Sequence, residues 1–229
     1  MVLTQNRGAT RSRGMAVDGQ GEKPATAREE IRSYQFWKAV RCEFLVTLLY
    51  VFIGCGTTTV WDPSQPADDV KVSLAFGLAV ATFVQCVGHI SGAHMNPAVT
   101  VAMLVTRNVT LLRAAFYVTA QCLGGVAGAG ILYGVTPPAV LGSLGVTRVH
   151  KDVALGQAFG VEFMITFIYV FTVFANMEPK RIDMGSRSLA IGLSVTMGHL
   201  FGMALFHDKT TTEWEADMIV SRHGAVFCR

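Results

Sequence analysis

The chain has 229 residues, of which 51% are hydrophobic and only 15% are charged, and its formal net charge is +3. A soluble domain of this length would need more charge to cover its surface, and so small a net charge does not indicate a nucleic-acid partner. The mean hydropathy is +0.41, and the apolar residues gather in blocks of about 20, the length that a helix needs to cross a bilayer. The composition therefore indicates a membrane protein.

The first 33 residues are polar and rich in Arg, Gly and Glu. No apolar run follows Met1, so we expect no cleavable signal peptide. We interpret residues 1–33 as a disordered cytoplasmic tail.

Five apolar stretches are long enough to be membrane spans, and tryptophan at both ends of the first one suits the membrane interface. The predicted spans are residues 37–61, 70–87, 111–135, 154–175 and 189–206. Basic residues concentrate in the N-terminal tail and in alternate loops, which predicts a cytoplasmic N-terminus. Residues 207–229 are polar and contain no apolar run long enough to span.

Two pairs of segments repeat in the same order along the chain. The segment EFLVT at 43–47 is echoed by EFMIT at 162–166, and SLAFGLAV at 73–80 is echoed by SLAIGLSV at 188–195. The first copy begins its first span from the inside and the second copy from the outside. This is an inverted-topology repeat, an architecture that places the functional site near the bilayer midplane, where broken helices meet.

A sixth apolar stretch, residues 89–106, is interrupted by polar residues and by the sequence SGAHMNPAV at 91–99. Asn96 is a good N-cap and Pro97 suits the first helical position, so a helix too short to span is expected from Pro97 to about residue 106. We interpret the stretch as a re-entrant half-helix with its positive end at mid-membrane, which would repel cations. The Asn96 amide could donate a hydrogen bond to passing water.

This segment resembles the first pore motif of the aquaporin family, and the resemblance extends over residues 33–201, closest to the water-selective branch. It implies an all-α membrane fold, an aquaporin-like helical bundle with an inverted repeat. It also implies passive water transport through a single-file pore, a homotetramer and a plasma-membrane location. Asn96, Pro97 and Ala98 would form the pore motif, while Phe76 and His199 would line the outer, selective constriction.

Each of these residues also has a plain structural interpretation. Asn96 could be a helix cap alone, His199 an interior histidine with a structural partner, and Phe76 a core or lipid-facing side chain. His94 is expected to brace the loop or line the vestibule. Gly124 and Gly128 have the spacing that permits close contact between helices.

Glu43 and Glu162 are acids inside spans, at equivalent positions of the repeat, and such residues are functional by default. A proton relay is one interpretation. The other is that each carboxylate accepts hydrogen bonds from an exposed loop backbone. The sequence shows no nucleophile–base pair, metal-ligand cluster or phosphate loop, so we expect neither an enzyme nor a cofactor nor a metal site.

The sequence departs from the family after Phe201. The repeat places a second pore motif near Thr211, but no Asn-Pro-Ala sequence, following arginine or sixth span is present there. The prediction is therefore five spans plus one half-helix in an incomplete transmembrane domain at 34–206, followed by a divergent tail at 207–229. Two functions stay open: a water channel, or a non-conducting isoform that assembles with full-length aquaporin subunits in a homo- or hetero-tetramer and modulates them.

Overall fold

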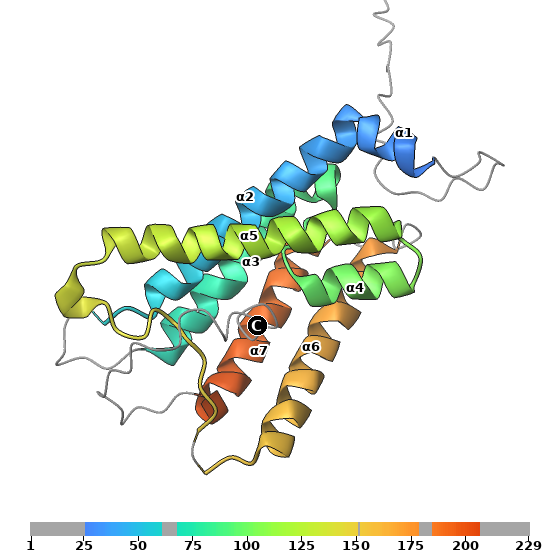
Figure 1. Cartoon of the computed structure of the whole chain (residues 1–229). Coiled ribbons are helices and arrows are strands. Elements are labelled where there is room, and N and C mark those ends of the chain that lie inside the picture. The colour runs from blue at the N-terminus through green and yellow to red at the C-terminus, as the bar shows by residue number, and fades with distance from the viewer. Residues whose placement is uncertain (1–25, 61–67, 151, 179–184, 207–229) are drawn as a thin grey trace, which may run out of the picture.

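The computed structural model describes residues 26–60, 68–150, 152–178 and 185–206 (Figure 1). All regular structure in these ranges is helical. The helices are α1 (Ala27–Arg32), α2 (Tyr34–Thr57), α3 (Asp69–Ser91), α4 (Pro97–Val105), α5 (Leu111–Val135), α6 (Leu155–Met177) and α7 (Arg187–Phe206), with a 3₁₀ turn at Pro138–Val140. The all-α fold class is confirmed. The predicted C-terminal tail, the predicted position near Thr211 and Trp61 lie outside the described residues.

Helices α2, α3, α5 and α6 are each long and apolar enough to cross a membrane. The fifth predicted span corresponds to α7, whose 20 residues extend about 30 Å, the thickness of a bilayer core. α4 has only nine residues and cannot span, as expected of a half-helix. The predicted elements are therefore present, with ends that differ by a few residues.

The end of the predicted N-terminal tail is ordered. Thr26 caps α1 through a capping box with Glu29, in which each side chain bonds the backbone N–H of the other residue. The hydrogen bond from the Thr26 backbone N–H, followed by one with the Thr26 side chain, lowers the pKa of the Glu29 carboxyl. Glu30 turns inward and pairs with Arg113 at the start of α5. The prediction of disorder over residues 1–33 is therefore wrong for α1, because capping and this ion pair stabilise a helix that composition alone does not indicate.

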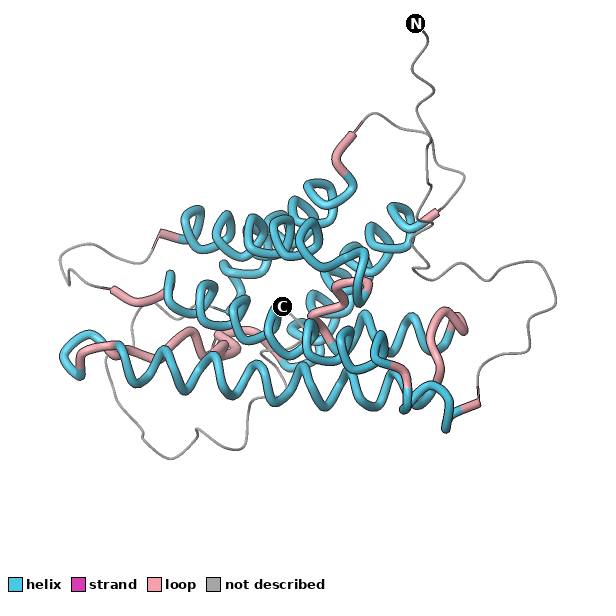
Figure 2. Tube along the Cα trace, turned by 90° about the horizontal axis from the view of Figure 1, so that it is seen from above, coloured by secondary structure: helices cyan, strands magenta, loops and turns pink. Residues whose placement is uncertain are grey.

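The helices form a circuit around the interior. α2 packs between α5 and α3, α3 crosses α7, and α7 packs on α6. The short helix α4 lies beside α5 and reaches α6, which completes the circuit (Figures 1 and 2). The interior enclosed by these elements is where the loop before α4 enters the bundle.

The predicted repeat is visible in the crossing of α3 and α7. Gly77 and Gly192 are equivalent positions of the two copies, and they face each other at this crossing. A Cβ atom on either glycine would collide with the backbone carbonyl of the other. The closest approach of the two halves thus occurs between symmetry-related residues, as expected of two copies related by a two-fold axis in the membrane plane.

The outer face of α2 is covered by α5. Gly124 and Gly128 lie directly against the backbone of α2 at Phe44 and Leu48, where an added Cβ would meet the carbonyl oxygens. Small residues four positions apart let two helix backbones approach closely. The close contact predicted from this spacing is therefore confirmed.

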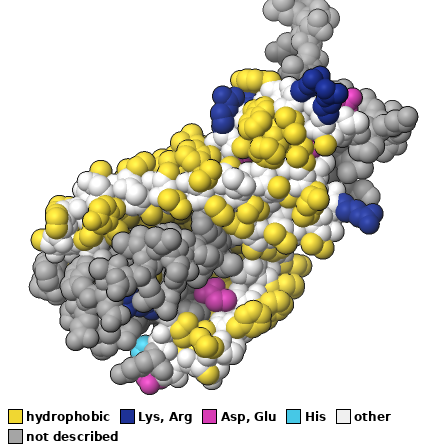
Figure 3. Space-filling model, viewed as in Figure 1, with side chains coloured by type: hydrophobic (Ala, Val, Ile, Leu, Met, Phe, Trp, Pro, Cys, Tyr) yellow, Lys and Arg dark blue, Asp and Glu magenta, His cyan; other side chains and the backbone are white. Residues whose placement is uncertain are grey.

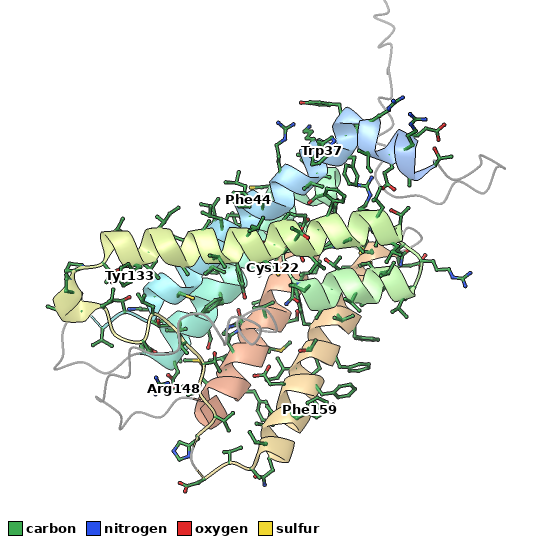
Figure 4. All side chains as sticks on the ribbon, in the orientation of Figure 1. Trp37, Phe44, Cys122, Tyr133, Arg148 and Phe159 are labelled. Atoms are coloured by element: carbon green, nitrogen blue, oxygen red, sulfur yellow. The ribbon has the colours of Figure 1, made fainter. Side chains whose placement is uncertain are left out.

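The equivalent face of α6 carries phenylalanines and is uncovered within the described part of the chain. The counterparts of Phe44 and Leu48 are Phe163 and Phe167, whose side chains are 59% and 54% exposed. The exposed Phe159 and Phe171 extend the row, because Phe159 stacks on Phe163 and Phe171 stacks on Phe167. Figure 4 shows Phe159 on the outer side of α6, where hydrophobic side chains gather on the surface (Figure 3). We call Phe159, Phe163, Phe167 and Phe171 the α6 phenylalanine face.

Gly128→Ala should lower the free energy of unfolding by about 1–3 kcal/mol, because the new methyl group overpacks the contact with α2. Gly130→Ala, two residues along the same helix, is the matched control, since nothing lies within 4 Å of a Cβ atom there. Thermal unfolding in detergent micelles measures the difference. Equal unfolding temperatures for the two variants would contradict the packing described for α5.

Candidate functional site

The loop between α3 and α4 has an unusual backbone. α3 ends at Ser91, and its C-cap Gly92 has a left-handed φ of 89°. Ala93 and Met95 follow with φ of 49° and 51°. Glycine tolerates this region, but for the other two residues it costs on the order of 1 kcal/mol or more each. The turn therefore exists only because surrounding groups hold it.

The Glu43 carboxylate of α2 holds this turn. Its Oε1 accepts the His94 N–H at 3.0 Å and its Oε2 accepts the Met95 N–H at 2.8 Å. The Ser91 hydroxyl donates to Oε1 at 2.6 Å and the Gln121 amide donates to Oε2 at 2.9 Å. Glu43 is fully buried, and four donors offset the cost of removing a carboxylate from water. The contacts with His94 and Met95 are of the kind expected if the carboxylate accepts hydrogen bonds from the loop backbone, the alternative to a proton relay.

A second set of polar groups closes the network on the side of α5. The Gln121 amide also donates to the Thr100 hydroxyl at 2.9 Å, and His94 Nδ1 lies 3.1 Å from the same hydroxyl. The His94 ring is buried and packs edge-on against Tyr117 of α5, with ring centroids 5.2 Å apart. His94 is thus part of the polar network that surrounds the loop.

Asn96 caps α4, because its Oδ1 accepts the Ala98 N–H at 2.7 Å while Pro97 occupies the first turn. With Oδ1 engaged in the cap, the amide nitrogen is the group left to act as a donor. Asn96 lines a small cavity at the centre of the bundle. Its volume, the space open to the centre of a water molecule, is about 10 Å³, about the room that one water needs.

The lining of this cavity follows the repeat. Tyr50 of α2 is matched by Tyr169 of α6, and Val80 of α3 by Val195 of α7; Met95 and Asn96 complete the wall. Each pair occupies equivalent positions of the two copies. The cavity therefore lies on the axis that relates the two halves, where an inverted repeat places its site.

Phe76 and His199, predicted to line a constriction, lie in direct contact. Their rings stack with centroids 4.4 Å apart and an angle of 20° between the planes. Gly54 makes room for the Phe76 ring, and His199 Nδ1 lies 3.0 Å from the Val195 carbonyl. A stacked pair in van der Waals contact leaves no room for water between the rings. The structure brings the two residues together as a closed pair.

Glu162 of α6 is half-buried, and the loop that the repeat assigns to it falls outside the described residues. Ser91, Thr100, Tyr117 and Gln121 are site residues that the sequence reasoning missed. Gln121 could have been found, because an uncharged polar residue in the middle of an apolar span needs a partner. Within the described residues, no group of three His, Cys, Asp or Glu side chains could hold a metal ion.

Glu43→Gln should destabilise the protein by at least about 2 kcal/mol, because one amide oxygen cannot accept from four donors and buried N–H groups lose their acceptor. Asp152→Asn, an equally conservative change at an exposed carboxylate, is the control and should change stability little. Thermal unfolding in detergent compares the two. A Glu43→Gln protein as stable as the control would contradict the role given to the carboxylate.

Comparison with known proteins shows which proteins this chain resembles. The family model described as major intrinsic protein matches residues 30–206. Aquaporin-4 of Mus musculus is 56% identical over 172 residues, covering 73% of this chain and 53% of that protein. The lens fiber major intrinsic protein of Rattus norvegicus is 54% identical over 175 residues, covering 76% of this chain and 66% of that one.

Among solved structures, the aquaglyceroporin from Plasmodium falciparum superposes with a TM-score of 0.66 at 22% identity, covering 75% of this chain and 74% of that one. At this identity the likeness shows the fold, an aquaporin-like helical bundle. The chain spans about half the length of the Aquaporin-4 relatives that it matches. With the family model covering most of its length, the chain belongs to the major intrinsic protein family, the aquaporins.

Proposed function

We propose that the chain is a water channel whose path passes the central cavity at Asn96. The observation that carries this proposal is the position of the capped N-terminus of α4 at a cavity lined by equivalent residues of both repeat copies. The names of the Aquaporin-4 relatives support it, since 55% identity extends over 172 residues, or 73% of this chain.

The chemistry of the cavity suits water. The Asn96 amide nitrogen is a fixed donor, and the N-terminus of α4 adds a positive potential that disfavours cations. Val80 and Val195 present apolar walls, which offer water no competing partners and leave it bound weakly enough to move on. In this proposal, Phe76 and His199 form the constriction of the water path, and water passes when their stacked rings separate.

The remaining assignments extend the same proposal. The basic residues of the tail and of alternate loops support a cytoplasmic N-terminus, and family membership supports a plasma-membrane tetramer in which each subunit has its own pore. Accessibility of an N-terminal tag in intact cells tests the orientation, and chemical crosslinking in membranes tests the tetramer. A tag labelled from outside, or a monomer only, would overturn the corresponding assignment.

Liposomes that contain this chain alone should swell faster under an osmotic gradient than protein-free liposomes. Asn96→Asp keeps the capping oxygen but removes the amide donor and adds a charge. The variant should therefore fold, yet conduct water about two- to tenfold more slowly, the range that the loss of one hydrogen bond predicts. Stopped-flow light scattering measures both rates. Swelling of the wild-type chain at the protein-free rate would overturn the channel proposal.

A second function, assembly with full-length aquaporin subunits, is favoured by the α6 phenylalanine face. The equivalent face of α2 is covered by a helix that presents glycines four residues apart, whereas Phe163 and Phe167 are more than half exposed. In a membrane, a face of this kind packs well against a helix with small residues. A non-conducting subunit could therefore bind a longer relative through α6 and alter its stability or trafficking.

Replacing Phe163 and Phe167 together by Ala should reduce co-purification with a tagged full-length aquaporin by about tenfold or more, because two large contact surfaces are lost. The matched control replaces Leu123 and Val126, which are similarly exposed on α5. Quantitative pull-down from co-expressing cells measures the effect. Absence of co-purification with the wild-type chain, or equal losses for both double variants, would overturn this second function.

A further inference from the structure

Polar contacts link α1, at the start of the described chain, to the loop that carries Asn96. The link begins at Glu30, which is only 9% exposed. Its Oε1 accepts from Arg113 Nε at 2.9 Å, and its Oε2 accepts from the Thr110 hydroxyl at 2.8 Å. Both partners belong to the first turn of α5 and its cap. Glu30 is therefore bound to the beginning of α5 through both carboxylate oxygens.

Arg113 connects this contact to the interior. Its Nη1 donates to the Tyr117 hydroxyl at 3.4 Å, one turn further along α5. Its guanidinium also lies over the ring of Phe36 at 5.3 Å and over the ring of Tyr117 at 5.8 Å. Phe36 and Tyr117 are fully buried in a small aromatic cluster near Trp37, where α2 begins (Figure 4). The guanidinium is thus held in a defined position between α1 and Tyr117.

Tyr117 completes the connection. Its hydroxyl donates to the Ser91 carbonyl at 2.9 Å, and the Ser91 hydroxyl donates to Glu43. Glu43 is the carboxylate that accepts from His94 and Met95. A contiguous set of polar contacts therefore runs from Glu30 to the strained backbone that precedes Asn96.

The negative charge of Glu30 stabilises Arg113 in the first turn of α5. A cation in the first turn of a helix is unfavourable, because the helix N-terminus is already positive. Arg113 occupies such a place in α5, and the Glu30 carboxylate neutralises it while accepting from the Thr110 cap. Without that anion, Arg113 is repelled by its own helix end and is drawn toward solvent, away from Tyr117.

We propose that α1 acts as a positioning element for the pore loop, with Glu30 holding Arg113, and Arg113 holding the Tyr117 hydroxyl on the Ser91 carbonyl. The inference rests on the proposed channel for its functional meaning. Displacement of α1 from α5 would loosen the backbone at His94 and Met95 and, through it, the cap at Asn96.

Hydrogen–deuterium exchange in lipid nanodiscs tests the inference without requiring water conduction. In Glu30→Gln, the amides of His94 and Met95 should exchange about three- to tenfold faster than in the wild type, as expected for a weakened charge-assisted hydrogen bond. Glu29→Gln is the matched control, since glutamine also completes a capping box and Glu29 is exposed. Amides of α7 serve as the internal reference and should not change.

A double-mutant cycle separates positioning from general support. Tyr117→Phe keeps the ring but removes the hydroxyl that reaches Ser91, so it should accelerate loop exchange by itself. In that background Glu30→Gln should add nothing, because the route from α1 is already cut. Arg113→Met removes the guanidinium that connects Glu30 with Tyr117. As a second, independent variant, it should reproduce the effect of Glu30→Gln on loop exchange.

The inference would be overturned by equal loop exchange in Glu30→Gln and Glu29→Gln, and also by additive effects of Glu30→Gln and Tyr117→Phe. A wild-type chain that fails to swell liposomes would overturn the channel proposal instead, and the exchange result would still decide whether α1 positions the loop. Loop exchange that rises together with α7 exchange would indicate global destabilisation and would also overturn the positioning role.

Discussion

The structure depends on one constraint: a non-helical backbone inside a membrane must find partners for its N–H groups within the protein. The loop before α4 has left-handed residues at Ala93 and Met95, so its N–H groups cannot be satisfied by helix bonds. The Glu43 carboxylate meets this need from α2, and in doing so fixes the distance between α2, the end of α3 and α5. The cap at Asn96 follows from that arrangement, because α4 can begin only where the turn ends.

The inverted repeat organises the rest of the interior. Gly77 and Gly192 allow α3 and α7 to cross in close contact, and the pairs Tyr50–Tyr169 and Val80–Val195 line the cavity from both copies. A pocket of this kind arises where two equivalent surfaces meet imperfectly, since large side chains from both halves cannot fill the same point on the axis. Asn96 also lines this space, and in the proposed channel its amide is the donor to water.

Much of this arrangement could be predicted because its signals are local or periodic. Span lengths, the Asn96 cap, the glycine spacing of α5 and the repeat all depend on residues close together or on comparison within the chain. The order of α1 could not be predicted, because it depends on an ion pair between Glu30 and Arg113, 83 positions apart. The contact of Phe76 with His199 likewise depends on the crossing of α3 and α7, and a family resemblance places both residues at a constriction without fixing the distance between them.

The hydrogen bonds that hold the pore loop come from one half of the bundle. The question of whether the chain conducts water is therefore separate from the question of whether it assembles with a partner. The hydrogen bonds described for the loop and for the cap of α4 come from α2, the end of α3, α4 and α5, all from the first copy. The α6 phenylalanine face, by contrast, shows no cover within the described residues. The geometry at Asn96 is therefore common to both proposed functions. In these proposals, a conducting chain differs from an assembling partner in whether Phe76 and His199 separate, and in what packs against α6.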